Sequence, residues 1–156
     1  MKPGSFTQIY IQLVFAVKNR EAALHLSYRK RVFEYMSGII TDMKHKSIIV
    51  NGVSDHVHIL LGLNPSISIS DTVHDIKRST SVFINKEKLC NGKFTWQGGY
   101  GGFSYGRFQL DKIYNYIQNQ EKHHEKISFK DEYYQFLEKF EILFNENYLF
   151  DFWDKA

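Results

Sequence analysis

Two histidines separated by one residue, His56 and His58, have the type and spacing of metal ligands. In a β-strand, residues two apart project from the same face, with Cα atoms about 6.5 Å apart. Two imidazoles placed in this way can bind one divalent ion, although two ligands do not complete a site. The spacing equally suits a sheet surface on which one histidine is exposed and the other is hydrogen-bonded. The pair therefore predicts either part of a metal site or an ordinary polar strand face.

A second group of polar side chains lies in a later segment with helical periodicity. The apolar residues with the spacing of a buried helical face are Leu110, Ile113, Tyr114 and Ile117. Tyr116, Gln120 and His123 recur at i, i+4 and i+7 on a different flank. We therefore predict that Tyr114 belongs to the core and that Tyr116 is presented beside Gln120, a candidate third metal ligand. The alternative is a partly exposed tyrosine beside a solvated amide.

Other charged or polar residues have weaker indications of function. The candidates for contacts with DNA phosphates are Lys18, Arg20, Lys77 and Arg78. Each is equally compatible with an ordinary solvated charge. His123 shares the flank of Tyr116 and is a candidate for contact with DNA or metal, whereas we place His124 nearer the packed side. Asp55 can orient His56 as a hydrogen-bond acceptor, or it can be a turn residue. We assign no role to His74.

The elements that must position these residues follow from local patterns. We expect strands over 9–17, 47–53, 56–63 and 94–96, and helices over 27–46, 70–89, 108–126 and 130–143, followed by an aromatic tail. Asn51-Gly52 offers an alternative hairpin turn. The order β-α-β-β-α-β, followed by helices, predicts an α+β fold with a ferredoxin-like antiparallel sheet and helices packed on it. Residues 97–106 contain five glycines, so we expect a flexible or close-approach segment there.

Composition and length restrict the class of protein. At 156 residues, the chain fits a single domain over 1–156 with a core at about 8–126. The net charge of +3 permits a polyanionic partner, and the 25 aromatic residues provide stacking surfaces for single-stranded nucleic acid. The single cysteine excludes an internal disulfide, and the first apolar run is too short to span a bilayer. We expect a cytoplasmic protein.

Three segments in this order resemble a known family. They are Asp55–Leu61, Trp96–Ser104 and Tyr116–Gln120. The sequence resembles the single-tyrosine HUH transposases, the insertion-sequence 200/605 family and its REP-associated relatives, over about Gln8 to Lys126. The resemblance implies that His56, His58 and Gln120 bind Mg²⁺ or Mn²⁺, and that Tyr116 is the catalytic nucleophile. It also implies that single-stranded DNA hairpins are cleaved and rejoined through a 5′-phosphotyrosine, without ATP.

Two further expectations come from the same resemblance. Family members act as homodimers, with two sheets joined edge to edge, and the five glycines would allow the tyrosine helix to serve the partner's metal site. We therefore hypothesise that Tyr116 acts in trans. The alternative function is that of a domesticated protein that binds or processes palindromic DNA without mobilising an element.

Other His-x-His enzymes fit the sequence less well. Histidine-triad hydrolases need a third histidine where this chain has Leu60, and an amidohydrolase barrel needs about 250 residues. Both classes are therefore excluded.

Overall fold

The chain folds around one antiparallel sheet with strand order β2-β3-β1-β4. The computed structural model describes residues 4–153. The strands are β1 Tyr10–Ala16, β2 Lys46–Gly52, β3 His56–Gly62 and β4 Gly101–Tyr105. The α-helices are α1 Leu26–Asp42, α2 Ile69–Lys86, α3 Leu110–Gln118, α4 Gln120–His123 and α5 Phe129–Lys139. Short 3₁₀ turns lie at Arg20–Ala22, Arg107–Gln109 and Glu146–Tyr148.

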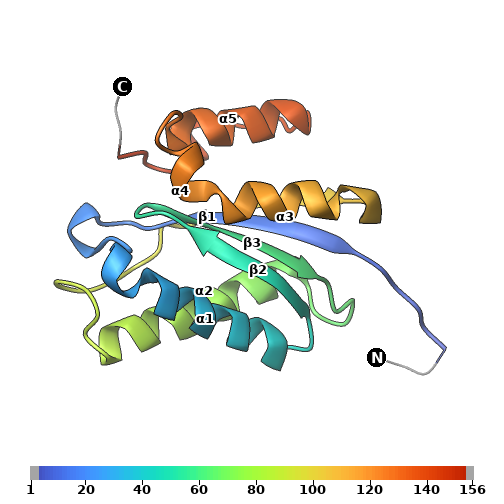
Figure 1. The fold of residues 1–156 in the computed structure, drawn as a ribbon, viewed down its shortest axis with the longest axis horizontal. Coiled ribbons are helices and arrows are strands. Elements are labelled where there is room, and N and C mark those ends of the chain that lie inside the picture. The colour runs from blue at the N-terminus through green and yellow to red at the C-terminus, as the bar shows by residue number, and fades with distance from the viewer. Residues whose placement is uncertain (1–3, 154–156) are drawn as a thin grey trace.

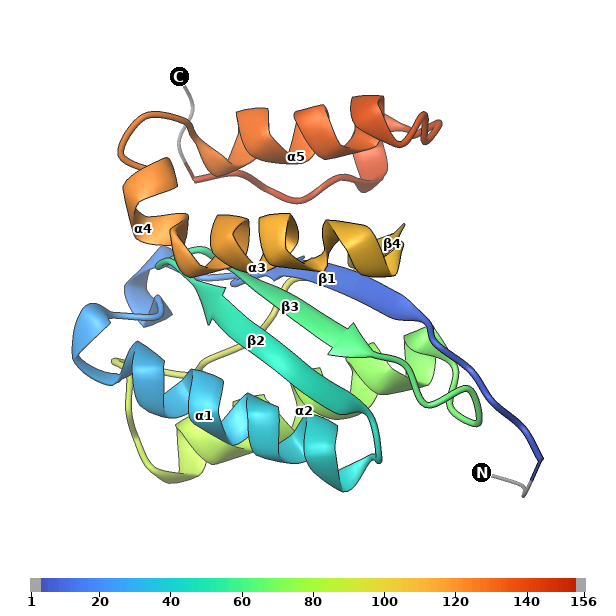
Figure 2. The ribbon, with the colours of Figure 1, turned by 45° about the vertical axis from the view of Figure 1, so that its right-hand side comes forward.

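Helices cover both faces of this sheet. Figure 1 shows α1 and α2 below the sheet and α3, α4 and α5 above it, and Figure 2 shows the same three layers after rotation. The strand order and the β-α-β-β-α-β succession are those of a ferredoxin-like fold, so the predicted fold class is confirmed. Among residues 4–153, no helix is both long and apolar enough to cross a lipid bilayer.

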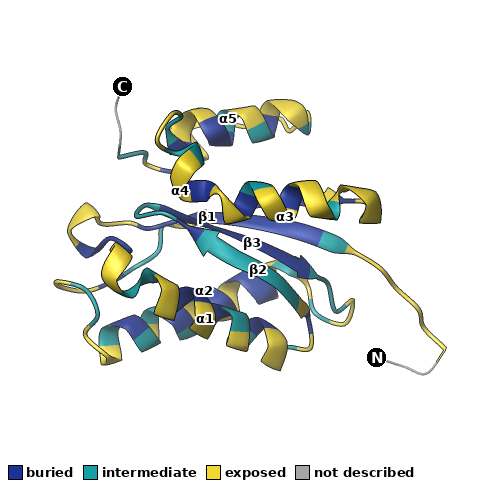
Figure 3. Ribbon diagram, viewed as in Figure 1, coloured by how far each residue is buried: buried dark blue, intermediate teal, exposed yellow. Residues whose placement is uncertain are grey.

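Because both faces are covered, the central strands are buried on both sides (Figure 3). Val57, Ile59 and Leu61 share one face of β3, and all three are fully buried. The opposite row of β3 contains His56 and His58, which are also fully buried. A polar pair in this position needs partners from the helices above it, because burying a polar group without a hydrogen bond is costly.

The glycine-rich segment contains the fourth strand. We expected a flexible segment at 97–106 and a short strand at 94–96, but β4 pairs with β1 from Tyr105 opposite Tyr10 to Gly101 opposite Val14. Trp96 makes only an isolated bridge to Val17. A side chain at Gly101 would collide with α5, because a Cβ there would lie 2.8 Å from Tyr133 Oη. The absence of a side chain therefore lets α5 approach the sheet.

The β2–β3 hairpin turns between Gly52 and His56, in agreement with the strands expected over 47–53 and 56–63. The alternative turn at Asn51-Gly52 is wrong, because Asn51 pairs with His58 and Gly52 with Val57 inside the ladder. Several helix boundaries also differ from expectation by one to four residues. The first helix ends at Asp42 rather than near 46, the second begins after the cap Ser68, and the fourth ends at Lys139.

The predicted helix over 108–126 is divided into α3 and α4 at Asn119. The Asn51 side-chain amide donates to the carbonyl oxygens of Ile117 (2.9 Å) and Gln118 (3.1 Å). The Asn119 side chain donates to the carbonyl oxygen of Asn115 at 2.8 Å. The Asn51 bonds satisfy two of the carbonyl groups at the end of α3, and the Asn119 side chain adds a second bond to the Asn115 carbonyl, which also accepts from Asn119 N. The break lies between Tyr116 and Gln120, and it therefore sets their relative placement.

Candidate active site

His56 and His58 lie on the face of β3 that α3, α4 and α5 cover. Both imidazoles are fully buried, with ring centroids 5.0 Å apart. Phe129, at the start of α5, stacks on His56 with a centroid separation of 3.8 Å and an interplanar angle of 3°. The rings are therefore held by packing as well as by hydrogen bonds. The sequence also allowed a sheet surface with one exposed histidine. The structure shows both histidines buried instead.

Polar residues beside the strand fix the orientation of both rings. Asp55 Oδ1 accepts a hydrogen bond from His56 Nδ1 at 2.7 Å, so the predicted orienting role of Asp55 agrees with the geometry. Gln12 Nε2 lies 2.9 Å from His58 Nδ1, and the Tyr105 hydroxyl donates to Gln12 Oε1 at 2.7 Å. A 180° turn of the Gln12 amide exchanges its donor and acceptor, so Gln12 can hold either tautomer of His58. In both histidines, Nε2 points into the space between sheet and helices.

Gln120 opens α4 and points into the same space. Its side chain is fully buried, and Oε1 lies 3.2 Å from His56 Nε2 and 3.0 Å from His124 Nε2. The structure thus brings Gln120 together with His56, although a helix break intervenes between Gln120 and Tyr116. His124 lies one turn after Gln120, and its placement on the packed side agrees with expectation.

Glu132, which no motif or spacing in the sequence had marked as functional, lies at the centre of this group. Its side chain is 2% exposed. Glu132 Oε1 lies 3.1 Å from the Nε2 atoms of His56, His58 and His124. A signal for it exists in the sequence, because Glu132 interrupts the apolar stripe of α5. The other members of that stripe are Phe129, Tyr133, Phe136, Leu137 and Phe140. A charged residue in such a stripe needs a buried partner.

The electrostatics of the group favour an ionised carboxylate. Burial raises the pKa of Glu132, but the surrounding histidines outweigh burial and hold that pKa well below its usual range. Burial lowers the pKa of His56, yet hydrogen bonds to Asp55 and Glu132 raise it overall to about 9. Burial lowers the pKa of His58, and this effect prevails there. At neutral pH His56 is therefore protonated between the carboxylates of Asp55 and Glu132, and a metal ion that binds there takes the place of its Nε2 proton.

Tyr116 reaches this group from α3. Its hydroxyl donates to Glu132 Oε2 and lies 3.3 Å from His123 Nε2. Burial, followed by the charge of Glu132, raises the pKa of Tyr116 well above its usual range, so the phenol is protonated in this state. We predicted that Tyr114 is buried in the core and that Tyr116 is presented beside Gln120. The predicted burial of Tyr114 is wrong. Tyr114 is 38% exposed, because α3 turns Ile113, Tyr116 and Ile117 inward instead.

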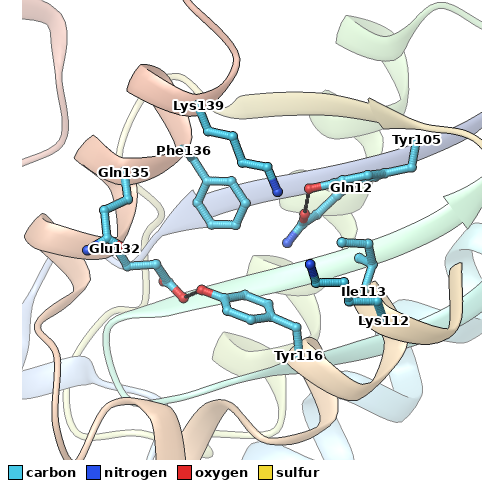
Figure 4. A pocket seen from close by; sticks show the side chains of 9 residues that line it. All are labelled: Gln12, Tyr105, Lys112, Ile113, Tyr116, Glu132, Gln135, Phe136 and Lys139. Carbon is cyan, nitrogen blue, oxygen red and sulfur yellow. Dashed lines mark hydrogen bonds between the residues drawn. The ribbon is translucent and has the colours of Figure 1, made fainter. Parts of the chain in front are cut away.

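A cavity of about 170 Å³ lies beside the Tyr116 ring, between α3, α5 and the sheet. Figure 4 shows the Tyr116 hydroxyl directed at Glu132 along one side, with Lys112 and Lys139 on the other. The remaining lining residues are Gln12, Tyr105, Ile113, Gln135 and Phe136. The nucleophile candidate therefore borders an apolar space that carries two cationic side chains.

The predicted DNA-binding cations occupy different environments. Lys18 and Arg78 are exposed, as is His74. Arg20 donates to the carbonyl oxygen of Trp153 at 2.6 Å. Lys77 is not a free surface cation: its ammonium donates to the carbonyl oxygens of Gln97 (2.9 Å) and Gly99 (2.7 Å). Lys77 thus joins α2 to the segment that leads into β4. Its ammonium supplies the hydrogen bonds that those two carbonyl groups do not receive from a neighbouring strand.

The donor set fits a divalent metal ion. His56, His58, His124 and Glu132 each offer a ligand atom, and these atoms all lie within 4.8 Å of one another. Imidazole nitrogen and carboxylate oxygen are both common ligands of divalent ions. Gln120 Oε1 lies next to two of these nitrogens, so the three predicted ligands are brought to one place.

Comparisons with known proteins agree with the fold. Residues 5–120 match the family model described as transposase, IS200-like. A Deinococcus radiodurans R1 protein classed as a transposase is similar at 23% identity, covering 77% of this chain and 96% of that chain, with a TM-score of 0.59. A REP-associated tyrosine transposase bound to a REP hairpin is similar at 12% identity, covering 81% and 76%, with a TM-score of 0.58. No curated protein gives a significant match.

Proposed function

Because this chain belongs to the family of IS200-like transposases, we propose that it binds single-stranded DNA hairpins and cleaves and rejoins DNA through Tyr116. The observation that carries the proposal is the position of the Tyr116 hydroxyl, which is hydrogen-bonded to Glu132 inside the cluster of buried histidines. One structural neighbour is described as bound to a REP hairpin, and this supports a hairpin as the class of DNA recognised.

His56, His58 and Gln120 hold a divalent ion, Mg²⁺ or Mn²⁺, in this proposal. The ion, when bound, polarises the non-bridging oxygens of the scissile phosphate and stabilises the charge that develops on them. Asp55 and Gln12 keep the two imidazoles oriented, as hydrogen-bonded partners of metal-binding histidines do. The protein thereby presents the site in a preorganised form.

Tyr116 supplies the nucleophile. Its oxygen loses the phenolic proton and forms a bond to phosphorus, while the bond from phosphorus to the 3′ oxygen breaks and that oxygen takes up a proton, giving a 5′-phosphotyrosine and a free 3′-OH. The link retains the phosphodiester energy, so the reverse attack by a 3′-OH rejoins strands without ATP. The carboxylate of Glu132 already accepts a hydrogen bond from the phenol, so it orients the hydroxyl before attack.

The cavity beside Tyr116 supports the placement of the scissile strand. Lys112 and Lys139 line it together with the Tyr116 ring. Two ammonium groups at this position suit the backbone phosphates that flank the cleaved bond. The exposed Lys18 and Arg78 remain candidates for more distant phosphates.

We further propose that the protein is a homodimer in which Tyr116 acts in trans. Three of the five glycines of the segment 97–106, Gly98, Gly99 and Gly106, lie outside β4, and Gly106 lies between β4 and α3. The outer edge of β4 has no strand partner within residues 4–153, so it is available to a second copy. Mixing Tyr116→Phe with His56→Ala protomers should restore cleavage in heterodimers; absence of any rescue would show that Tyr116 acts in cis.

The main test uses a pool of labelled single-stranded hairpin oligonucleotides with randomised flanking tetranucleotides. Incubation with Mg²⁺ or Mn²⁺ should give a protein–DNA adduct that survives denaturation. Tyr116→Phe should abolish the adduct, whereas Tyr114→Phe, a matched change at an exposed position of the same helix, should retain it. An adduct that persists in Tyr116→Phe would refute the assigned nucleophile.

A further inference from the structure

His124 and Glu132 share the space of the two strand histidines, but both lie beyond the segment 5–120 that matches the family model. Glu132 comes from α5, and three features hold that helix in place. Ser128 Oγ caps its first turn by accepting from Asp131 N at 3.1 Å, Phe129 stacks on His56, and Tyr133 lies over Gly101. The carboxylate therefore points at the histidines because the whole helix is docked there.

The three histidines share one hydrogen-bonding arrangement. Each Nδ1 atom is engaged away from the centre: with Asp55 for His56, with Gln12 for His58, and with the carbonyl oxygen of Ile127 for His124, at 2.8 Å. A backbone carbonyl can only accept, so Nδ1 of His124 carries a proton and the neutral ring has a free lone pair on Nε2. Metal-binding histidines are oriented in this way by the partner of their other nitrogen.

The distances suit coordination of one ion. With bonds of about 2.1 Å, adjacent ligand atoms are about 3.0 Å apart in octahedral geometry and about 3.4 Å apart in tetrahedral geometry. Glu132 Oε1 lies 3.1 Å from Nε2 of each of His56, His58 and His124. The four ligand atoms all lie within 4.8 Å of one another, so rotations of the imidazole side chains bring them onto a single ion, while Oε2 keeps its hydrogen bond to Tyr116.

We propose that His124 and Glu132 bind the same ion as His56, His58 and Gln120, and that this centre, with three imidazoles and one carboxylate, selects a first-row transition ion such as Mn²⁺ or Co²⁺ over Mg²⁺. Imidazole nitrogen favours transition ions, whereas Mg²⁺ prefers a shell of oxygen ligands and water. The inference rests on the metal dependence in the proposed function, but it concerns which residues bind the ion and which ion is chosen.

A purely structural role for Glu132 has the opposite consequence. If the carboxylate only accepts hydrogen bonds from the imidazoles, it competes with the ion for them, and its removal leaves Mn²⁺ affinity unchanged or increases it. If it is a ligand, its removal lowers the affinity. The sign of the change in affinity therefore separates the two roles.

The test is calorimetric titration of the full-length protein with Mn²⁺ and with Mg²⁺, without DNA. The wild type should bind Mn²⁺ on the order of 100-fold more tightly than Mg²⁺. Glu132→Gln should weaken Mn²⁺ binding on the order of 100-fold, and His124→Ala should weaken Mn²⁺ binding more than Mg²⁺ binding. The matched controls Glu138→Gln, on the exposed side of α5, and His74→Ala, exposed on α2, should bind both ions as the wild type does.

A second measurement needs no variant of the site. Pulsed electron paramagnetic resonance of the wild-type Mn²⁺ protein should count three coordinated imidazoles. Two imidazoles, or unchanged Mn²⁺ affinity in folded Glu132→Gln, would overturn the inference. The DNA adduct assay is scored separately: Mn²⁺ bound by three imidazoles without any adduct would refute the proposed cleavage and leave the metal centre standing.

Discussion

Replacing Lys77 with methionine separates a structural role of this residue from a role in binding DNA. Its ammonium donates to the carbonyl oxygens of Gln97 and Gly99 and lies 5.3 Å from the centre of the Phe15 ring. A hydrogen bond to a charged group contributes about 1.5–3 kcal/mol, but the partly exposed ammonium is screened by solvent. We therefore expect Lys77→Met to lower the free energy of unfolding by about 2 kcal/mol in total.

The assay is urea unfolding at pH 7, followed by circular dichroism. Burial lowers the pKa of Lys77 to about 8, so this pH keeps the ammonium charged. A loss of about 2 kcal/mol corresponds to a fall in Tm of about 4–8 °C. The neighbouring exposed Arg78→Met should change stability by less than about 0.5 kcal/mol. Unchanged stability in Lys77→Met, together with a salt dependence of DNA binding reduced by about one phosphate contact, would refute the structural assignment.

Three other substitutions test the frame around the site. Gly101→Ala should cost about 1–3 kcal/mol in urea unfolding, because the new Cβ meets Tyr133; a loss within error would contradict the close approach of α5. Asp55→Ala should weaken Mn²⁺ binding by about 10–100-fold in calorimetry, since His56 loses its orienting partner, and unchanged affinity would count against that role. Asn51→Ala should cost about 1 kcal/mol and speed hydrogen exchange at the end of α3; unaltered exchange there would show that Asn51 does not hold this helix.

The β-α-β-β-α-β succession and the helix placement followed from local patterns, but the position of β4 did not. Glycine has low strand propensity, so Gly101 and Gly102 concealed a strand whose ladder uses backbone groups of β1. The alternation that marks it, with Phe103 and Tyr105 buried and Ser104 exposed, becomes clear only once β1 is in place beside it. Pairing with β1, which is distant in the sequence, therefore determines the structure of this segment, whereas its local composition predicted a flexible one.

Within the site, spacing along one element was predictable and the convergence of several elements was not. His56 and His58 share a strand face, so their proximity followed from the strand period. Whether Tyr116 or Tyr114 is buried depends on which side of α3 meets the sheet. Either tyrosine can lie beside Ile113 and Ile117 on an apolar side of the helix, so the spacing of residues did not decide between them. Glu132 lies on a separate helix, and only the docking of α5 brings it to the histidines.

The most direct measurement of the central claim is the mass of the peptide that carries the DNA. After cleavage of a hairpin oligonucleotide, nuclease and trypsin digestion should leave a nucleotide on the peptide from Ile113 to Lys122, which contains both Tyr114 and Tyr116. Fragmentation then assigns the site of attachment. We expect a 5′-phosphodiester on Tyr116 alone. Attachment at Tyr114, or an adduct on any other peptide, would contradict the assignment of Tyr116 as the nucleophile.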